Sequence, residues 1–282
     1  MDGQEITYVA WDLPQEFTEV FLIPISDIHK GNPFFSEKHC HRTIDFIARK
    51  PNAYWVGNGD WMEAAIRISK GDVYGQTESP KKQISWCKKE FKDIASKGLG
   101  FDSGNHEGRI YDATGLDPAE DIAEYLDVPY SPEGLLMKIS FGGGNENHKD
   151  APYVFWVYMS HGYGGARTKA AKAKKVEDQS HYINADCHLM SHDHVVNVSP
   201  AIELNPDNRT HDVGKRWREG NVKAKRVMLV KTSAYLKWGG YSQRFGYPPS
   251  DLTTPVIKLM TPKSPYWEQY PEKPKQCVKV DV

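Results

Sequence analysis

The sequence has few cysteines and no long hydrophobic run. Its four cysteines are far apart and include no CxxC pair, so we expect reduced, mostly structural thiols. No apolar run approaches the ~18 residues that a membrane-spanning helix needs. The first residues, MDGQEITYVAWDLPQE, are acidic and polar and do not resemble a signal peptide. We therefore expect a soluble cytoplasmic protein with no membrane partner.

Net charge is also nearly absent. The chain has 36 basic and 37 acidic residues, a formal net charge of -1. This excludes a global basic field for nucleic acid and leaves only local patches. Hydrophobic residues at 39% and charged residues at 26% are ordinary globular values and do not indicate disorder. A length of 282 residues suits one α/β domain, with or without a small appendage.

Short apolar runs alternate with helix-like stretches, which is typical of an α/β domain. The pattern predicts strands at residues 20–25, 53–56, 135–141, 153–159, 185–190, 195–204, 227–236 and 256–260. It predicts helices at residues 36–49, 81–97 and 117–126. We expect one domain over residues 1–262. Residues 263–282 are rich in proline and lysine and are predicted to form an irregular extension.

Side chains that can bind metals recur just after predicted strands. In chain order they are Asp27, His29, Asp60, Asn105, His106, His161, His192 and His194. Open α/β sheets place their functional sites at strand ends, where the following loop is free to vary. An Asp-x-His or His-x-His segment can direct both side chains into one pocket where its loop bends. Imidazole, carboxylate and amide groups together suit transition metals.

Each of these segments has an ordinary structural alternative when it is taken alone. An Asp-x-His segment is commonly a plain loop, a Gly-Asp pair a turn, and a single histidine a buried core residue. His192 and His194 fit such an alternative less well, because alternate residues of a regular strand face opposite ways. The coincidence of so many ligand types in one chain favours a metal site.

In their order, these segments resemble the calcineurin-like metallophosphoesterase superfamily. The family pattern is D-x-H, GD, GNH[DE], a lone histidine and GHxH. Here the segments read SDIHKG, GNGDWME, SGNHEG, MSHGYG and MSHDHV, over about the first two thirds of the chain. Ser191 replaces the glycine of the last segment, and we expect this small residue to leave the ligands unaffected. The resemblance implies a four-layer α/β/β/α sandwich of two mixed sheets flanked by helices.

The resemblance also implies a site for two divalent metal ions. One ion is assigned to Asp27, His29 and His194, the other to Asn105, His161 and His192, with Asp60 bridging both. Manganese is the expected metal, with iron, zinc and nickel as alternatives that accept the same ligands. The implied reaction is attack of a metal-bridging hydroxide on a phosphate ester. His106 matches the catalytic histidine that protonates the leaving oxygen; packing within its turn is the alternative.

Several branches of the family are excluded by single positions. Glu63 stands where purple acid phosphatases have a tyrosine ligand, and DWMEAA lacks the arginine of the protein serine/threonine phosphatases. The chain is also too short for the capping domain of double-strand-break repair nucleases. A broad group of phosphodiesterases, nucleases and small-molecule phosphatases remains, and within it the basic and aromatic residues described below favour a phosphodiesterase that acts on nucleic acid, DNA or RNA. A phosphomonoesterase or nucleotide phosphatase, and a catalytically silent phosphate-binding module, are the alternatives.

Three further features bear on the substrate. Arg109 can hold a phosphate oxygen through two hydrogen bonds, or can form a surface salt bridge. Three lysines recur every third residue of RTKAAKAKK and would form a basic stripe on a helix, or simply a solvated face: Lys169, Lys172 and Lys175. Three aromatic residues in glycine-rich loops can stack on bases, or can pack within their loops: Tyr163, Trp238 and Tyr241.

Overall fold

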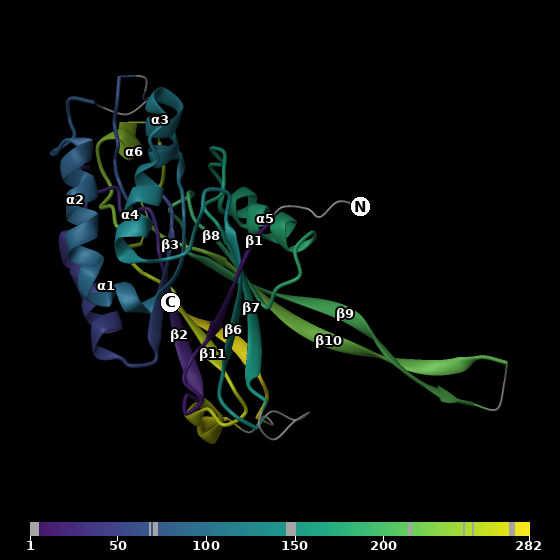
Figure 1. Ribbon diagram of the computed structural model, residues 1–282. Coiled ribbons are helices and arrows are strands. Elements are labelled where there is room, and N and C mark those ends of the chain that lie inside the picture. The colour runs from purple at the N-terminus through teal and green to yellow at the C-terminus, as the bar shows by residue number, and fades with distance from the viewer. Residues whose placement is uncertain are drawn as a thin grey trace.

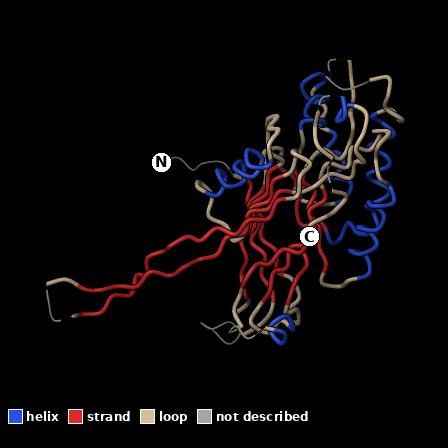
Figure 2. Tube along the Cα trace, turned by 180° about the vertical axis from the view of Figure 1, so that it is seen from behind, coloured by secondary structure: helices blue, strands red, loops and turns tan. Residues whose placement is uncertain are grey.

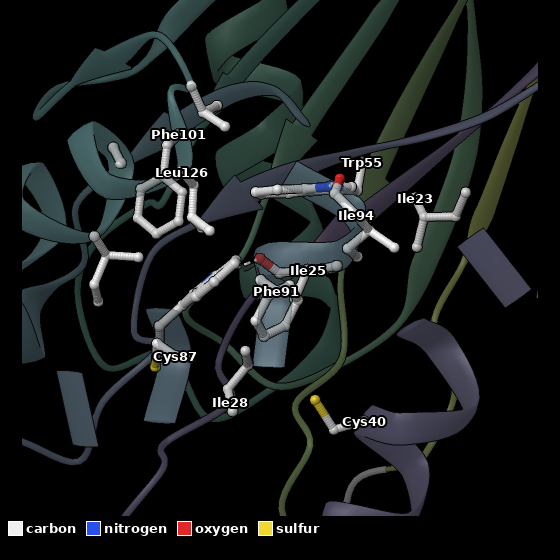
Figure 3. Packing of buried hydrophobic residues seen from close by; sticks show 14 of the residues in the cluster. Ile23, Ile25, Ile28, Cys40, Trp55, Cys87, Phe91, Ile94, Phe101 and Leu126 are labelled. Carbon is white, nitrogen blue, oxygen red and sulfur yellow. Dashed lines mark hydrogen bonds between the residues drawn. The ribbon is translucent and has the colours of Figure 1, made fainter. Parts of the chain in front are cut away.

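The strand β2 (Glu19–Ile25) is apolar on both of its faces, so both must be covered. Val20 and Leu22 face a second sheet, whereas Phe21, Ile23 and Ile25 face helices. Figure 3 shows the helix-side cluster, in which the Trp55 indole N–H donates to the carbonyl of Ile94 at 2.7 Å. The computed structural model describes residues 6–67, 69, 73–144, 151–213, 216–244, 246–249, 251–270 and 274–282, except the side chain of Tyr241.

The sheet that contains β2 has six strands. In spatial order they are β12 (Cys277–Asp281), β11 (Val256–Met260), β2, β3 (Ala53–Asn58), β4 (Gly98–Asp102) and β5 (Tyr130–Ser131). The last four are parallel to one another, whereas β11 runs antiparallel to both of its neighbours, β2 and β12. Because β2, β3 and β4 are parallel, the loops that follow them leave the sheet at one edge.

The other sheet also has six strands and is mixed. Its order is β1 (Thr7–Asp12), β6 (Leu135–Phe141), β7 (Tyr153–Ser160), β8 (Cys187–Met190), β10 (Arg218–Lys231) and β9 (Asn197–Asp212). Strands β7, β8 and β10 are parallel, whereas β6–β7 and β9–β10 are antiparallel. Apolar side chains of both sheets interdigitate in one cluster between them.

Helices cover the outer faces of both sheets (Figure 1). Over the β2 sheet lie α1 (Glu37–Arg49), α2 (Pro80–Phe91), the 3-10 helix η1 (Lys92–Lys97) and α4 (Pro118–Leu126). Helix α5 (Lys169–Ser180) covers the other sheet, where Val176 packs with Met190 and Leu229. The predicted four-layer sandwich of two mixed sheets is therefore confirmed. No helix in the described segments is both long enough and apolar enough to cross a bilayer.

The hairpin of β9 and β10 projects beyond the rest of its sheet, as both views show (Figures 1 and 2). Sequence predicted shorter strands at 195–204 and 227–236. The hairpin extends further because the two strands pair with each other even where their side chains are polar. Strand β10 ends at Lys231 because the following segment turns toward α1, where Ser36 N donates to the Tyr235 carbonyl at 2.7 Å.

The end of the chain differs from the predicted irregular extension. It contains the 3-10 helix η2 (Pro265–Gln269) and strand β12, which pairs antiparallel with β11. Val278 is buried in the cluster between the sheets. The proline- and lysine-rich composition around it concealed this short alternating strand. Residues 277–281 are therefore an edge of the sheet, whereas a domain boundary at residue 262 stays a prediction.

Candidate metal centre and its cavity

The predicted ligands lie in loops that follow β2, β3, β4, β7 and β8. Backbone hydrogen bonds hold these loops against one another. Asp27 N donates to the Gly59 carbonyl and His29 N to the Asp60 carbonyl, both at 3.0 Å. Ser191 N donates to the His161 carbonyl, also at 3.0 Å. His192 N, in the loop after β8, donates to Asp27 Oδ2 at 3.2 Å, so the loops of the two sheets meet at one place.

The first cluster contains Asp27, His29 and His194, whose candidate ligand atoms all lie within 4.8 Å of one another. His194 Nε2 is 3.1 Å from Asp27 Oδ1 and 3.2 Å from His29 Nε2. Asp27 is fully buried, and its Oδ1 accepts no hydrogen bond from the described residues. A buried carboxylate oxygen that faces two imidazole nitrogens is a typical arrangement for a cation.

The second cluster contains Asp60, His161 and His192. His161 Nε2 is 3.2 Å from Asp60 Oδ2 and 3.3 Å from His192 Nδ1. Asp60 Oδ2 also lies 3.9 Å from His29 Nε2, in the first cluster. Asp60 is therefore placed between the two groups, as a bridging ligand must be.

Asn105 and His106 begin the helix α3 (Asn105–Thr114), beside the second cluster. Asn105 lines the same cavity as the histidines. His106 N donates to Asp60 Oδ1 at 2.8 Å, and its ring lies 4.4 Å from the His29 ring. Figure 1 shows α3 at the edge of the sheet where these loops gather. All eight predicted ligand and catalytic residues thus converge, although their individual roles stay predictions.

Five of these residues have left-handed backbone conformations. Their φ angles are 50° at Asp27, 51° at His29, 52° at Asp60, 70° at His192 and 53° at His194. A left-handed residue turns the chain sharply, so two residues separated by one can face the same pocket, as the Asp-x-His and His-x-His segments do here. Such conformations cost about 1–3 kcal/mol each and occur mainly where function requires them.

Two histidines are oriented by hydrogen bonds on the side away from the cluster. His161 Nδ1 donates to the Asn58 carbonyl at 2.9 Å, and His192 Nε2 donates to the Gly164 carbonyl at 2.5 Å. These bonds leave His161 Nε2 and His192 Nδ1 as the nitrogens that face Asp60. Hydrogen bonds of this kind fix both the tautomer and the ring orientation of metal-binding histidines.

Glu63 supports the first cluster in a related way. Its Oε2 lies 3.4 Å from His29 Nδ1 and accepts a hydrogen bond from Asn32 Nδ2 at 2.9 Å. Burial favours the neutral acid, but the neighbouring His29 outweighs burial and lowers the pKa of Glu63 to about 2. In the sequence, Glu63 stands out only as the residue that replaces the tyrosine ligand of purple acid phosphatases. Its spacing three residues after Asp60 was the available signal.

Glu107 is a second supporting carboxylate that the sequence analysis did not single out. It is buried and accepts from three backbone N–H groups: Asp60 at 3.0 Å, Met62 at 3.0 Å and Gly104 at 3.1 Å. Burial raises its pKa to about 7. Glu107 therefore fixes the loop after β3 to the start of α3, which places Asp60 beside Asn105 and His106.

Asp193, between the ligands His192 and His194, is held by three lysines. Its carboxylate lies 2.7 Å from Lys231 Nζ and 2.8 Å from Lys175 Nζ, and its carbonyl accepts from Lys172 Nζ at 2.8 Å. Lys231 comes from β10 and the other two lysines from α5. The loop that carries two predicted ligands is thereby fixed to a strand and to a helix.

The predicted basic stripe on α5 is therefore wrong as an exposed surface. Lys172 is only 4% exposed and lies on the buried face with Val176, whereas Lys169 is exposed. Burial of Lys172 is tolerated because the Asp193 carbonyl accepts from its ammonium group. Lys172 also lines the cavity beside the histidines. A substrate-binding role for Lys169 and Lys172 stays a prediction.

One cavity of about 620 Å³ opens over the clusters. Its lining includes His29, Asp60, Asn105, His106, His192 and His194. Arg109 also lines it, with Nη1 3.4 Å from Ser69 Oγ. In the described part of the chain no carboxylate pairs with Arg109, so the predicted alternative of a salt bridge is not observed there. A cavity of this size is ordinary for a small-molecule site.

Burial and the neighbouring carboxylates shift the pKa values of the histidines in and beside the two clusters. Burial disfavours a charged imidazole, but Asp60 outweighs it and raises the pKa of His161 to about 10. Burial lowers the pKa of His106 to about 4, so this ring is neutral at pH 7. Two buried carboxylates, Asp27 and Asp60, thus lie among imidazoles whose nitrogens face them. The donor set fits one or two divalent transition-metal ions.

Comparisons with known proteins find distant matches among solved structures. No protein-family model matches the chain, and no curated protein matches it. A Vps29 mutant from Entamoeba histolytica matches with 13% identity and a TM-score of 0.37, covering 93% of this chain and 97% of that one. A metallophosphoesterase from Sphaerobacter thermophilus matches with 10% identity and a TM-score of 0.38, covering 86% and 83%.

A predicted phosphoesterase from Streptococcus pneumoniae also matches, with 12% identity, a TM-score of 0.36, and coverage of 94% of this chain and 98% of that one. Likeness at this level is too distant to assign an activity. The fold and the site themselves define the class: a two-sheet α/β sandwich with clustered Asp and His side chains that could hold metal ions.

Proposed function

We propose that this chain is a metal-dependent phosphoester hydrolase whose preferred substrates are phosphodiesters. One observation carries the proposal: seven side chains from five separate segments of the chain gather at one cavity, which five of them line, and the carboxylate of Asp60, the predicted bridging ligand, lies between the two groups. Asp27, His29 and His194 would hold one ion, and Asn105, His161 and His192 the other. When bound, two such ions supply Lewis acidity at a phosphoryl group and a nucleophile at neutral pH.

The chain's own groups supply the remaining chemistry. Arg109 lines the cavity, and its guanidinium can form two hydrogen bonds to a non-bridging phosphate oxygen. His106 Nδ1 donates to the Glu63 carbonyl at 2.6 Å, which leaves Nε2 directed toward the cluster. A bound phosphate next to this nitrogen would stabilise the imidazolium and raise its pKa. His106 is then placed to hand a proton to the leaving oxygen.

The test is a panel of substrates with manganese-loaded protein. Bis-p-nitrophenyl phosphate reports diester hydrolysis, p-nitrophenyl phosphate reports monoester hydrolysis, and linear and circular DNA report nuclease activity. We expect turnover of the diester. Activity on the monoester alone would replace the proposal with a phosphomonoesterase, and no hydrolysis of any substrate would leave a phosphate-binding module.

Two variants separate metal binding from proton transfer. His106→Ala should lower kcat by about 10²–10⁴-fold, because a general acid contributes about that much, while elemental analysis finds the metal retained. Asp60→Ala should lose metal as well as activity, because it removes the carboxylate shared by both clusters. An active Asp60→Ala protein without bound metal would refute the proposal.

A further inference from the structure

One wall of the cavity contains no predicted ligand and is rich in aromatic and glycine residues. It is formed by Phe34 and by residues 236–240, 242, 244, 247 and 248, which include Trp238 and Tyr247, and it shares the cavity with the Asp and His clusters. The segment contains the short helix α6 (Tyr241–Arg244). Neither metal binding nor proton transfer uses this wall.

The wall is built by close packing of two glycines on an aromatic ring. A Cβ atom at Gly239 would lie 2.3 Å from a ring carbon of Phe34, and one at Gly240 would lie 2.6 Å from another. Because no side chain could fit at either position, the backbone lies directly on the Phe34 ring. This contact covers one face of the Phe34 ring and fixes the distance between that ring and the backbone of Gly239 and Gly240.

The indole of Trp238 makes one hydrogen bond through its N–H and remains accessible to a ligand in the cavity. Its indole N–H donates to the Tyr247 carbonyl at 2.8 Å, yet the side chain is 44% exposed and lines the cavity. The Arg167 guanidinium lies 5.9 Å from the centre of the Tyr247 ring. Since the only polar group of the indole already has a partner, its accessible surface can offer a ligand only an aromatic face.

Backbone hydrogen bonds fix this wall to the ligand loop after β2. Lys237 N donates to the Phe34 carbonyl at 2.9 Å, and Tyr235 N donates to the Asp27 carbonyl at 3.0 Å. Phe35 and Leu236 form an isolated antiparallel bridge. Trp238 is the third residue after Tyr235, which contacts the predicted ligand Asp27 directly. The backbone therefore sets the position of Trp238 relative to the clusters.

Cationic side chains accompany the aromatic wall. Arg109, Lys237 and Arg244 all line the cavity, and among the described residues none of them forms an ion pair with a carboxylate. An aromatic face beside unpaired cations suits a ligand that combines a flat ring with phosphate charge. A cavity of about 620 Å³ has room for such a ligand.

We propose that Trp238 is a stacking platform for the nucleobase of a nucleotide unit whose phosphate lies at the Asp and His clusters. This inference rests on the proposed phosphoesterase function and specifies its substrate class. The base stacks on the exposed indole, while the cations contact phosphate oxygens. Because stacking is tolerant of base identity, the wall selects for nucleotides without selecting a sequence.

Calorimetric titration of the manganese-loaded protein tests the proposal with two ligands that differ only in the base. These are adenosine 5′-monophosphate and ribose 5-phosphate. We expect wild-type protein to bind the nucleotide about tenfold more tightly, since stacking of one base on an aromatic residue has about that effect. Should either ligand be hydrolysed, the ratio of KM values replaces the ratio of Kd values.

Three variants identify the residue. Trp238→Ala should bind both ligands equally, with metal content and affinity for ribose 5-phosphate unchanged. Trp238→Phe keeps an aromatic face and should retain most of the preference. Trp217→Ala is the matched control, because Trp217 is 55% exposed but belongs to the turn region of the β9–β10 hairpin and does not line the cavity.

The outcomes separate this inference from the function on which it rests. Equal binding of the two ligands by wild type, or an undiminished preference in Trp238→Ala, overturns the stacking platform. If the same preparation still hydrolyses bis-p-nitrophenyl phosphate, the phosphoesterase proposal stands without it. If the preparation hydrolyses no ester, the phosphoesterase proposal fails, whichever way the two ligands bind.

Discussion

The carboxylate of Asp193 lies 2.7 Å from Lys231 Nζ, and neither side chain reaches solvent appreciably, with exposures of 2% and 0%. The pair connects the loop between β8 and β9 to the middle layer of the molecule. In the sequence, Asp193 stands directly between the predicted ligands His192 and His194. Its integrity should therefore affect both stability and metal affinity.

Asp193→Asn should destabilise the protein by about 3 kcal/mol, because it leaves the Lys231 ammonium buried without a counter-charge. Urea unfolding in the presence of a chelator measures this without a contribution from bound metal. Manganese affinity, measured by titration, should fall as well, since the ligand loop loses its ion pair with Lys231 of β10.

The double variant Asp193→Asn/Lys231→Met is the control for this prediction. Removing both charges eliminates the unpaired ammonium and should recover most of the lost stability. Lys175, the other partner of Asp193, is less buried and can reach water. Equal instability of the single and double variants would show that the ion pair is not the cause.

Gly104→Ala should displace the bridging carboxylate. A Cβ atom at Gly104 would lie 2.1 Å from Asp60 Oδ1 and 2.3 Å from the Asp60 backbone nitrogen. Since a backbone atom cannot move aside without shifting the whole loop, we expect the free energy of unfolding to fall by about 1–3 kcal/mol. Metal content by elemental analysis should drop in parallel.

Gly108→Ala, one turn further along α3, is the matched control. A Cβ atom there would meet nothing within 4 Å. Alanine should stabilise the helix interior by about 0.5–1 kcal/mol and leave metal content unchanged. If both variants bound metal like the wild type, the tight packing at Gly104 would not control the position of Asp60.

Metal ions should stabilise the folded chain selectively. A ligand present at 100 times its Kd adds about 2.7 kcal/mol to the free energy of unfolding. Because the clusters combine imidazole nitrogens with only a few carboxylate oxygens, Mn²⁺ or Zn²⁺ should raise the Tm of chelator-treated protein, whereas Ca²⁺, which requires about six to eight oxygen ligands, should not. Asp60→Asn should abolish the increase, and a Tm indifferent to every transition metal would contradict the site.

His188 should make the chelator-treated protein sensitive to acid. It is buried in β8, neither ring nitrogen has a hydrogen-bond partner among the described residues, and burial lowers its pKa to about 4. The unfolded chain, with a pKa near 6.5, binds the proton more readily. Stability contributed by the neutral ring is therefore complete above about pH 6.5 and is lost as the pH falls toward 4.

His188→Leu should remove this dependence on pH. As the pH falls from 8 to 5, wild type should therefore lose about 2 kcal/mol of unfolding free energy that the variant keeps. Urea unfolding at the two pH values, with excess chelator, measures the difference. Parallel pH curves for wild type and His188→Leu would contradict the prediction.

The convergence of the predicted ligand residues could be foreseen from the sequence because each short segment is recognisable by itself. Asp27-x-His29 and His192-x-His194 each follow an apolar strand that is itself legible, and parallel pairing brings their loops together. The supporting residues could not be found in this way. Glu107 acts on Asp60, Met62 and Gly104 through contacts that only the folded chain creates.

The α5 lysines also show that burial caused by contacts distant in the sequence could not be predicted from the sequence. A spacing of three predicts a shared helix face but not whether that face is buried. Lys172 is buried because the Asp193 carbonyl, 21 residues later, accepts from it. Strands β1 and β12 were missed for a related reason: both are short strands at the edges of their sheets, and their strand structure depends on pairing with β6 and β11.

The projecting hairpin has a consequence for how these molecules behave in a concentrated solution. Strand β9 is the last of its sheet and is 16 residues long, a shape that normally invites another chain to add itself edge to edge and to grow into fibres. Pro200 and Pro206 lie within that strand. Since neither has an N–H to donate, an incoming strand cannot form a continuous ladder, and the arm can extend into solvent without seeding aggregation.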